Sequence, residues 1–121
     1  MNFDPKNELK YNIKVQIYKS SKSFGPGIAK IMELVKETGK LSEAYNSMNL
    51  SPSKGWKIIK RAEEEFGFTF IISQVGGSGG GKSYLSKEGE DLLMKYNLFI
   101  SELDVEAERI FNKYFNCDKQ S

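Results

Sequence analysis

The sequence predicts an α+β fold that is mainly helical, and three observations predict it. Two helical patterns are separated by a tight turn at residues 49–52, where Ser51 and Pro52 are typical of a helix start. A β-branched and aromatic run follows, and then a glycine-rich stretch. The chain continues in a helical pattern of about 30 residues with a narrow apolar stripe. Together these patterns predict a winged helix-turn-helix with an N-terminal strand or hairpin and a long C-terminal dimerisation helix.

Length and composition fit one domain of ordinary size and exclude several kinds of chemistry. The 121 residues include no histidine and a single cysteine, Cys117. Without histidine, neither a Ser-His-Asp nor a Cys-His nucleophile can form, and the usual zinc sites cannot form either. No apolar run is long enough to span a membrane, and the N-terminus lacks the pattern of a secretory signal. We therefore expect a cytoplasmic protein that is not an enzyme and holds no metal or cofactor.

The charges are unevenly distributed along the chain. Lys and Arg number 18 and Asp and Glu number 16, which gives a net charge of +2. Residues 1–85 contain 13 of the basic and 8 of the acidic side chains, and residues 86–121 contain the other 5 and 8. An anionic partner, such as nucleic acid, is expected to meet the basic part of the chain.

The N-terminal region is predicted to contain a half-buried strand over residues 9–18. Apolar side chains alternate with polar ones at Leu9, Tyr11, Ile13, Val15 and Ile17. This period of two places the apolar side chains on one face of a strand. A turn at residues 19–22 is then expected to lead to a short return strand at Phe24.

Three helices are predicted next, over about residues 26–38, 43–48 and 52–66. Ser42 and Ser51 are placed to cap the second and the third helix. Asn49 tolerates the left-handed backbone that the turn between them requires. Gly39 and Gly67 suit the C-terminal ends of the first and third helices.

The predicted third helix has two faces of different chemistry. Its buried stripe comprises Gly55, Ile58, Ile59, Ala62 and Phe66. Its other side carries four cations, Lys54, Lys57, Lys60 and Arg61. A helix N-terminus also presents free backbone N–H groups and a positive dipole, so this end favours phosphates and base edges. Trp56 is expected to fill the junction with the preceding helix, because a core of this size needs a large aromatic residue. Stacking on a nucleic-acid base is the weaker alternative for this side chain.

A wing is predicted over residues 68–85, and a long helix follows at 87–116. The stripe of this helix has spacings of three and four and comprises Leu92, Tyr96, Phe99, Leu103, Ala107, Ile110 and Tyr114. Such a stripe is typical of a helix that pairs with a second copy.

Residues 76–83 match the pattern of a phosphate-binding loop, with Gly76, Gly81, Lys82 and Ser83 at the required spacing. In nucleotide-binding enzymes this loop opens directly into a helix. Here the following residues are predicted to form a strand, and the alternating strands and helices of a parallel sheet are missing. Nucleotide binding is therefore the weaker alternative.

Several short motifs occur in a specific order over about residues 9–100. They are Phe24-Gly25-Pro26-Gly27, Thr38-Gly39-Lys40-Leu41-Ser42, Leu50-Ser51, Trp56, Phe66-Gly67, the glycines of 76–81, Leu85-Ser86, Gly89, Leu92-Leu93 and Tyr96. In this order they resemble the N-terminal DNA-binding domain of the ModE-type molybdate-responsive regulators, whose fold is LysR-like. The resemblance implies a dimeric winged-helix DNA-binding protein with its third helix in the major groove and its long last helix pairing the subunits.

The chain departs from that family at three points. Tyr45 stands where the family has a small residue, and Pro52-Ser53 stand where it often has Tyr and Lys. No stretch resembles the Ser-Ala-Arg-Asn-Gln motif of the family's molybdate-binding modules. The domain is therefore expected to stand alone, without molybdate sensing.

The sequence thus predicts a transcriptional regulator that binds double-stranded DNA as a homodimer at a two-fold operator. Residues 1–88 are the expected DNA-binding domain, 87–116 the dimerisation helix and 117–121 a tail. Base edges are expected to meet Ser51, Ser53, Lys54 and Lys57. Phosphates are expected to meet Ser42, Lys60 and Arg61, and, on the wing, Gly77, Ser78, Gly79, Gly80 and Lys82. A winged-helix module that binds another protein is the main alternative, and the sequence identifies no effector.

Overall fold

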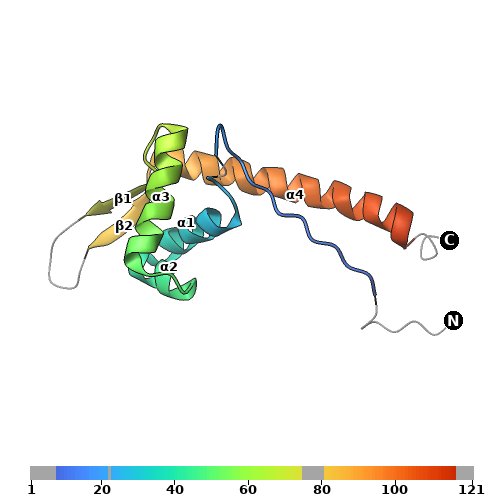
Figure 1. Ribbon diagram of the computed structural model, residues 1–121, viewed down its shortest axis with the longest axis horizontal. Helices are drawn as coiled ribbons and strands as arrows, with labels where there is room; N and C mark the ends of the chain where they lie inside the picture. Colours follow the sequence, from blue (N-terminus) through green and yellow to red (C-terminus); the bar gives the residue numbers. More distant parts are fainter. Residues whose placement is uncertain (1–7, 22, 75–80, 117–121) are drawn as a thin grey trace.

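The computed structural model describes residues 8–21, 23–74 and 81–116. Within these ranges the order of elements is α1 (Pro26–Thr38), α2 (Leu41–Ser47), α3 (Pro52–Phe66), β1 (Ile71–Gln74), β2 (Lys82–Leu85) and α4 (Lys87–Phe115). In Figure 1, α1–α3 and the β1–β2 hairpin gather at the N-terminal end of α4, and the rest of α4 projects away from them. The protein therefore has the mainly helical α+β architecture of a winged helix.

One hydrophobic core joins the three short helices to the hairpin and to the first turns of α4. It is formed by buried side chains from every element, among them Phe24, Ile31, Met32, Val35, Ala44, Ile59, Ala62, Phe70, Leu85, Leu93 and Tyr96. Phe24 lies at its centre, with its ring centroid 5.8 Å from Phe70 and 5.0 Å from Tyr96. Edge-on aromatic contacts of this kind stabilise a small core beyond the area that they bury.

The turn between α2 and α3 has the predicted chemistry. Asn49 is left-handed, with φ of 56°, and the Ser51 hydroxyl accepts a hydrogen bond of 3.3 Å from the Lys54 N–H. Pro52 occupies the first turn of α3, and Gly67, with φ of 85°, ends that helix. These local signals set where α3 begins and ends.

The cap predicted for Ser42 is wrong, because α2 begins at Leu41 with Lys40 as its N-cap residue and no side-chain cap. Gly39 ends α1 in the left-handed conformation. The Lys40 N–H then donates to the hydroxyl of Thr38, at 3.1 Å. The chain enters the next helix at once, so Ser42 lies inside the first turn of α2 and its side chain is exposed.

The hairpin is shorter than the segment predicted for the wing. β1 and β2 are antiparallel and pair Ile71 with Leu85 and Gln74 with Lys82. The Ser83 N–H donates to the carbonyl of Gly39 at 2.8 Å, which ties β2 to the end of α1. The base of the hairpin is therefore held by the helices.

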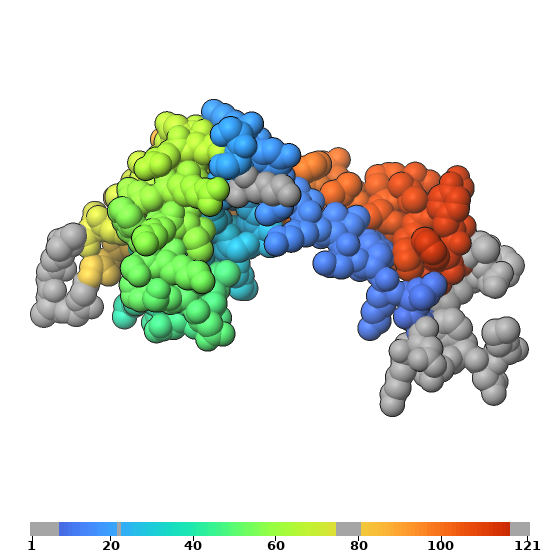
Figure 2. Space-filling model, in the orientation of Figure 1, coloured from blue at the N-terminus to red at the C-terminus, as the bar shows by residue number. Residues whose placement is uncertain are grey.

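The predicted N-terminal strand is not formed. Residues 8–16 are extended without a ladder, and beyond them a single bridge joins Ile17 to Phe24. We call residues 8–16 the arm; it runs along α4 (Figures 1 and 2). The Tyr11 ring lies 4.7 Å from that of Phe111, and the Tyr11 hydroxyl donates to Glu108 at 3.1 Å. The alternating pattern marks an extended chain with one apolar side, and this side meets a helix here instead of a second strand.

The first part of α4 belongs to the core, which corrects the role predicted for Tyr96. The Ser86 hydroxyl caps the helix by accepting from the Gly89 N–H at 2.8 Å, and it donates to the Thr69 carbonyl. Tyr96 is 2% exposed, and its hydroxyl donates to the Val15 carbonyl at 2.8 Å. Tyr96 therefore packs within its own chain and does not face a second subunit.

Candidate nucleic-acid interface

The outward face of α3 is the most basic surface that the short helices present. Ser53, Lys54, Lys57 and Arg61 are all exposed on it. The opposite stripe is turned inward, with Gly55, Ile59 and Ala62 buried and Ile58 and Phe66 partly buried against the core. Figure 2 shows α3 (green) across the front of the molecule. The two faces of α3 are thus separated as the sequence predicts.

Two of the three acidic residues at the end of α3, Glu63 and Glu65, are held by hydrogen bonds within the protein, whereas Glu64 is exposed. Glu63 is buried, and one of its oxygens accepts from the Phe70 N–H at 2.7 Å and from the Ile71 N–H at 3.3 Å. Its carboxylate also pairs with Lys60, at 3.3 Å. Glu63 therefore joins α3 to β1, and part of the Lys60 charge is balanced within the protein.

Glu65 is held by the serine-rich turn that follows the arm. Its carboxylate accepts from the Ser21 hydroxyl at 2.6 Å, from the Lys19 N–H at 2.8 Å and from the Ser23 hydroxyl at 2.9 Å. These hydrogen bonds hold the pKa of Glu65 well below its usual range, and the one from the Ser21 side chain has the largest effect. The sequence predicts only a turn at residues 19–22, and the serines in and beside it are the one sign of an anchored carboxylate.

Trp56 lies on the surface, which corrects its predicted place in the core. Its side chain is 57% exposed, and the Lys60 ammonium lies 6.0 Å from its ring centre. The junction between α2 and α3 is filled by Tyr45, which is 5% exposed. Tyr45 packs against Gly55, where an added Cβ would come within 2.3 Å of the Tyr45 ring. The glycine therefore makes room for the tyrosine, and Trp56, the next residue along the helix, points outward beside the basic side chains.

The wing is described only in part. Lys82 is exposed at the start of β2, whereas Gly77, Ser78, Gly79 and Gly80 lie outside the described residues. Ser83 is buried, and its hydroxyl lies 3.0 Å from that of Ser73 across the hairpin. Lys82 and Ser83 thus form a strand, and the helix that a phosphate-binding loop requires at these residues is not formed.

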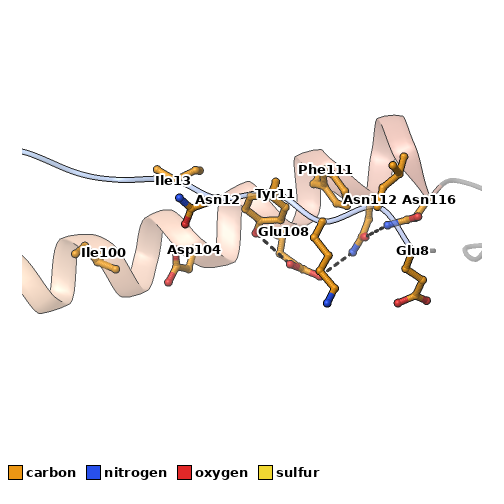
Figure 3. Close-up of a pocket in the computed structure, with 12 residues that line it drawn as sticks. Glu8, Tyr11, Asn12, Ile13, Ile100, Asp104, Glu108, Phe111, Asn112 and Asn116 are labelled. Atoms are coloured by element: carbon orange, nitrogen blue, oxygen red, sulfur yellow. Dashed lines mark hydrogen bonds between the residues drawn. The ribbon is translucent and has the colours of Figure 1, made fainter. Parts of the chain in front are cut away.

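A groove of about 700 Å³ lies between the arm and α4 (Figure 3). Tyr11 and Ile13 line one side, and Ile100, Glu108 and Phe111 line the other.

Across the three described ranges, no group of three or more His, Cys, Asp or Glu residues is placed to hold a metal ion. No helix in those ranges is long and apolar enough to cross a membrane.

The helix-turn-helix of α2 and α3, followed by the hairpin, defines the protein as a winged helix. No protein-family model and no curated protein matches the sequence. Among solved structures, the chain is similar to a point mutant of Lactococcus lactis ZitR, with a TM-score of 0.55 and 14% identity over 95% of this chain and 77% of that one. This similarity supports the winged-helix fold, and it does not support the specific resemblance to ModE-type regulators.

Proposed function

We propose that the protein is a DNA-binding transcriptional regulator that binds a two-fold operator as a homodimer. The observation that carries this proposal is the exposed cationic face of α3, from which Glu63 and Glu65 are withdrawn by internal hydrogen bonds. The fold shared with ZitR, a winged-helix regulator, supports the same class. Residues 1–88, completed by the first turns of α4, would be the DNA-binding domain, and the rest of α4 would be the dimerisation helix.

In this proposal α3 enters the major groove by its N-terminal half. Ser51, Ser53, Lys54 and Lys57 meet base edges, where hydroxyl and ammonium groups form hydrogen bonds. Trp56 joins this set, since an exposed indole beside a basic face can contact thymine methyl groups or stack on a base.

Phosphates are met around this helix and position it on the duplex. Arg61 and Lys60 lie further along α3, and Ser42 lies in the first turn of α2. The wing follows the DNA backbone through Lys82 and through Gly77, Ser78, Gly79 and Gly80. Of the two α3 cations, Lys60 contributes less because Glu63 shares its charge.

The homodimer is formed by the stripe of α4 without Tyr96. Phe99, Ile110 and Tyr114 are 50%, 46% and 66% exposed, and Leu92, Leu103 and Ala107 are partly exposed. Two such helices would place the two copies of α3 on half-sites about 34 Å apart, one turn of DNA, or a multiple of it.

Selection of bound duplexes from a random pool, followed by titration at several salt concentrations, tests this function. A two-fold consensus and a log–log slope of roughly −0.9 for each phosphate contact are expected. Absence of binding even at low salt would overturn the proposal. It would favour a protein-interaction module instead, for which the exposed row of Met94, Leu98 and Val105 on α4 is the supporting observation.

A further inference from the structure

The arm is an extended segment whose apolar side is only partly covered. Leu9 and Ile13 remain 61% and 46% exposed although both line the groove against α4. Within the described residues, the only backbone pairing beside the arm is the bridge between Ile17 and Phe24. An extended segment with an unpaired edge is a template for a further strand.

One edge of the arm is available along its length. In an extended chain the backbone N–H and C=O groups of successive residues point to opposite edges. The bridge to Phe24 uses the groups of Ile17, and the Val15 carbonyl, on the same edge, accepts from the Tyr96 hydroxyl at 2.8 Å. No backbone hydrogen bond within the described residues uses the other edge. That edge carries the groups of Lys10, Asn12, Lys14 and Gln16.

The sequence of the arm suits antiparallel pairing with a second copy of itself. With Ile13 opposite the partner's Ile13, residues 9–17 of the two copies pair along their whole length. The apolar residues of both arms then share one face, because only a shift by an odd number of residues would turn one apolar side outward. Tyr11 stands opposite the partner's Val15, and aromatic side chains opposite β-branched ones stabilise a sheet.

The lysines of the arm distinguish this register from its neighbours. In the register centred on Ile13, Lys10 stands opposite the partner's Gln16 and Lys14 opposite the partner's Asn12, so each cation meets an amide. A slide by two residues in one direction would place Lys10 opposite the partner's Lys14. In the other direction Lys14 would stand opposite its own copy. Like charges directly opposite are unfavourable, and longer slides shorten the paired segment.

We propose that the arms of two copies pair as an antiparallel two-stranded ribbon centred on Ile13, which lies on the α4 helices of both copies. A two-stranded ribbon is marginally stable alone, so it needs the apolar surface that α4 supplies. The ring of Tyr11, 4.7 Å from that of Phe111, anchors each arm to this surface. This inference rests on the homodimer of the proposed function and adds a second contact to it.

Disulfide formation tests the register. Ile13→Cys, combined with Cys117→Ser, places the two new thiols in a non-hydrogen-bonded pair with Cα atoms about 4.5 Å apart, within the range of a disulfide. Leu9→Cys, also with Cys117→Ser, is the matched control. Position 9 is the more exposed of the two, but its copies would lie about 26 Å apart in the ribbon. Mild oxidation should cross-link the Ile13 variant roughly tenfold faster, and equal rates or a faster reaction at position 9 would overturn the ribbon.

A proline tests the backbone hydrogen bonds without changing the apolar side of the arm. Asn12→Pro removes an N–H group that faces the partner's Lys14 carbonyl, and it does so twice in the dimer. Dimerisation measured by sedimentation equilibrium should therefore weaken roughly tenfold. Asn12→Ala keeps the N–H group and should dimerise within about twofold of the unchanged protein. Equal dimerisation of the proline and alanine variants would contradict pairing through this edge.

Amide hydrogen exchange separates failure of this interface from failure of the proposed function. In the dimer the N–H groups of the even-numbered arm residues should exchange more slowly than those of Tyr11 and Ile13, and dilution should remove the difference. A dimer that lacks this alternation and the Ile13 cross-link would overturn the ribbon, leave the edge to solvent or to another protein's strand, and leave the regulator function standing. An unchanged protein that stays monomeric would remove the homodimer itself, whereas DNA binding is tested separately by the salt titration.

Discussion

At the scale of single residues, Gly55 and Tyr45 act as a pair. The ring of Tyr45 occupies the space beside α3 that a side chain at position 55 would need. Tyr45, which stands where a small residue was expected, is thereby accommodated in the core. Because the Tyr45 ring fills this space, Trp56 lies on the surface.

Replacing Gly55 should therefore destabilise the protein. Gly55→Ala forces the Tyr45 ring to move and should lower the free energy of unfolding by about 1–3 kcal/mol, measured by urea denaturation. Gly27→Ala is the matched control, since a Cβ there meets nothing within 4 Å; we expect it to be neutral or to stabilise by up to about 1 kcal/mol. Equal stability of the two variants would show that the Tyr45–Gly55 contact is not tight.

Glu65 should make stability depend on pH. Hydrogen bonds from Ser21 and from the backbone of Lys19 depress the pKa of Glu65 in the folded state. Its contribution is therefore present above the unfolded pKa of about 4.3 and is lost as the pH falls below it. Glu65→Gln should lower the Tm at pH 7. The difference in Tm between this variant and the unchanged protein should become smaller as the pH is lowered toward 3. Glu64→Gln, at the exposed neighbouring position, is the control. A difference in Tm for Glu65→Gln that stays constant with pH would contradict the role assigned to the Glu65 carboxylate.

At the scale of elements, α3 combines a buried stripe, two carboxylates (Glu63 and Glu65) held by internal hydrogen bonds, and an outward basic face. Lys57→Ala should weaken DNA binding and reduce the salt slope by about 0.9 if the ammonium meets a phosphate, with little change in Tm because the side chain is exposed. Lys36→Ala, on the exposed side of α1, should leave the affinity unchanged. Unfolding of the Lys57 variant would show that this face of α3 is structural.

Trp56 gives a direct signal from α3, because it is the only tryptophan in the chain. Its fluorescence should change on addition of the selected duplex. Trp56→Ala should weaken DNA binding by roughly tenfold, in line with the loss of one stacking contact. Trp56→Phe should retain part of the affinity. Unchanged fluorescence with bound DNA would place the indole outside the interface.

At the scale of the whole molecule, the two parts of α4 have different roles. Its first turns complete the core through Leu93 and Tyr96, which are each 2% exposed. Its later turns carry the open stripe. A chain that ends at residue 88 should therefore fail to fold, while a chain that ends at residue 101 should fold as a monomer. Circular dichroism and sedimentation measure the two outcomes, and a dimer of residues 1–101 would contradict the role of the stripe.

The fold and the basic face of α3 could be predicted because their signals act over a few residues. Ser51, Asn49 and Gly67 fix the ends of α3 by local backbone chemistry, and the period of its apolar side chains fixes its faces. The withdrawn acids could not be predicted in this way. In the sequence, Glu63 and Glu65 resemble solvent-exposed charges. Their hydrogen-bond donors lie elsewhere in the sequence, at the start of the hairpin and in the serine turn.

The residues alone predict the helices, the turn between α2 and α3, the hairpin and the side of α3 that faces outward. They do not predict that the arm packs on α4, that Tyr45 takes the place expected for Trp56, or that Tyr96 belongs to the core. An apolar side chain specifies burial and not its partner. Which distant surface covers it depends on volume and position after the chain has folded.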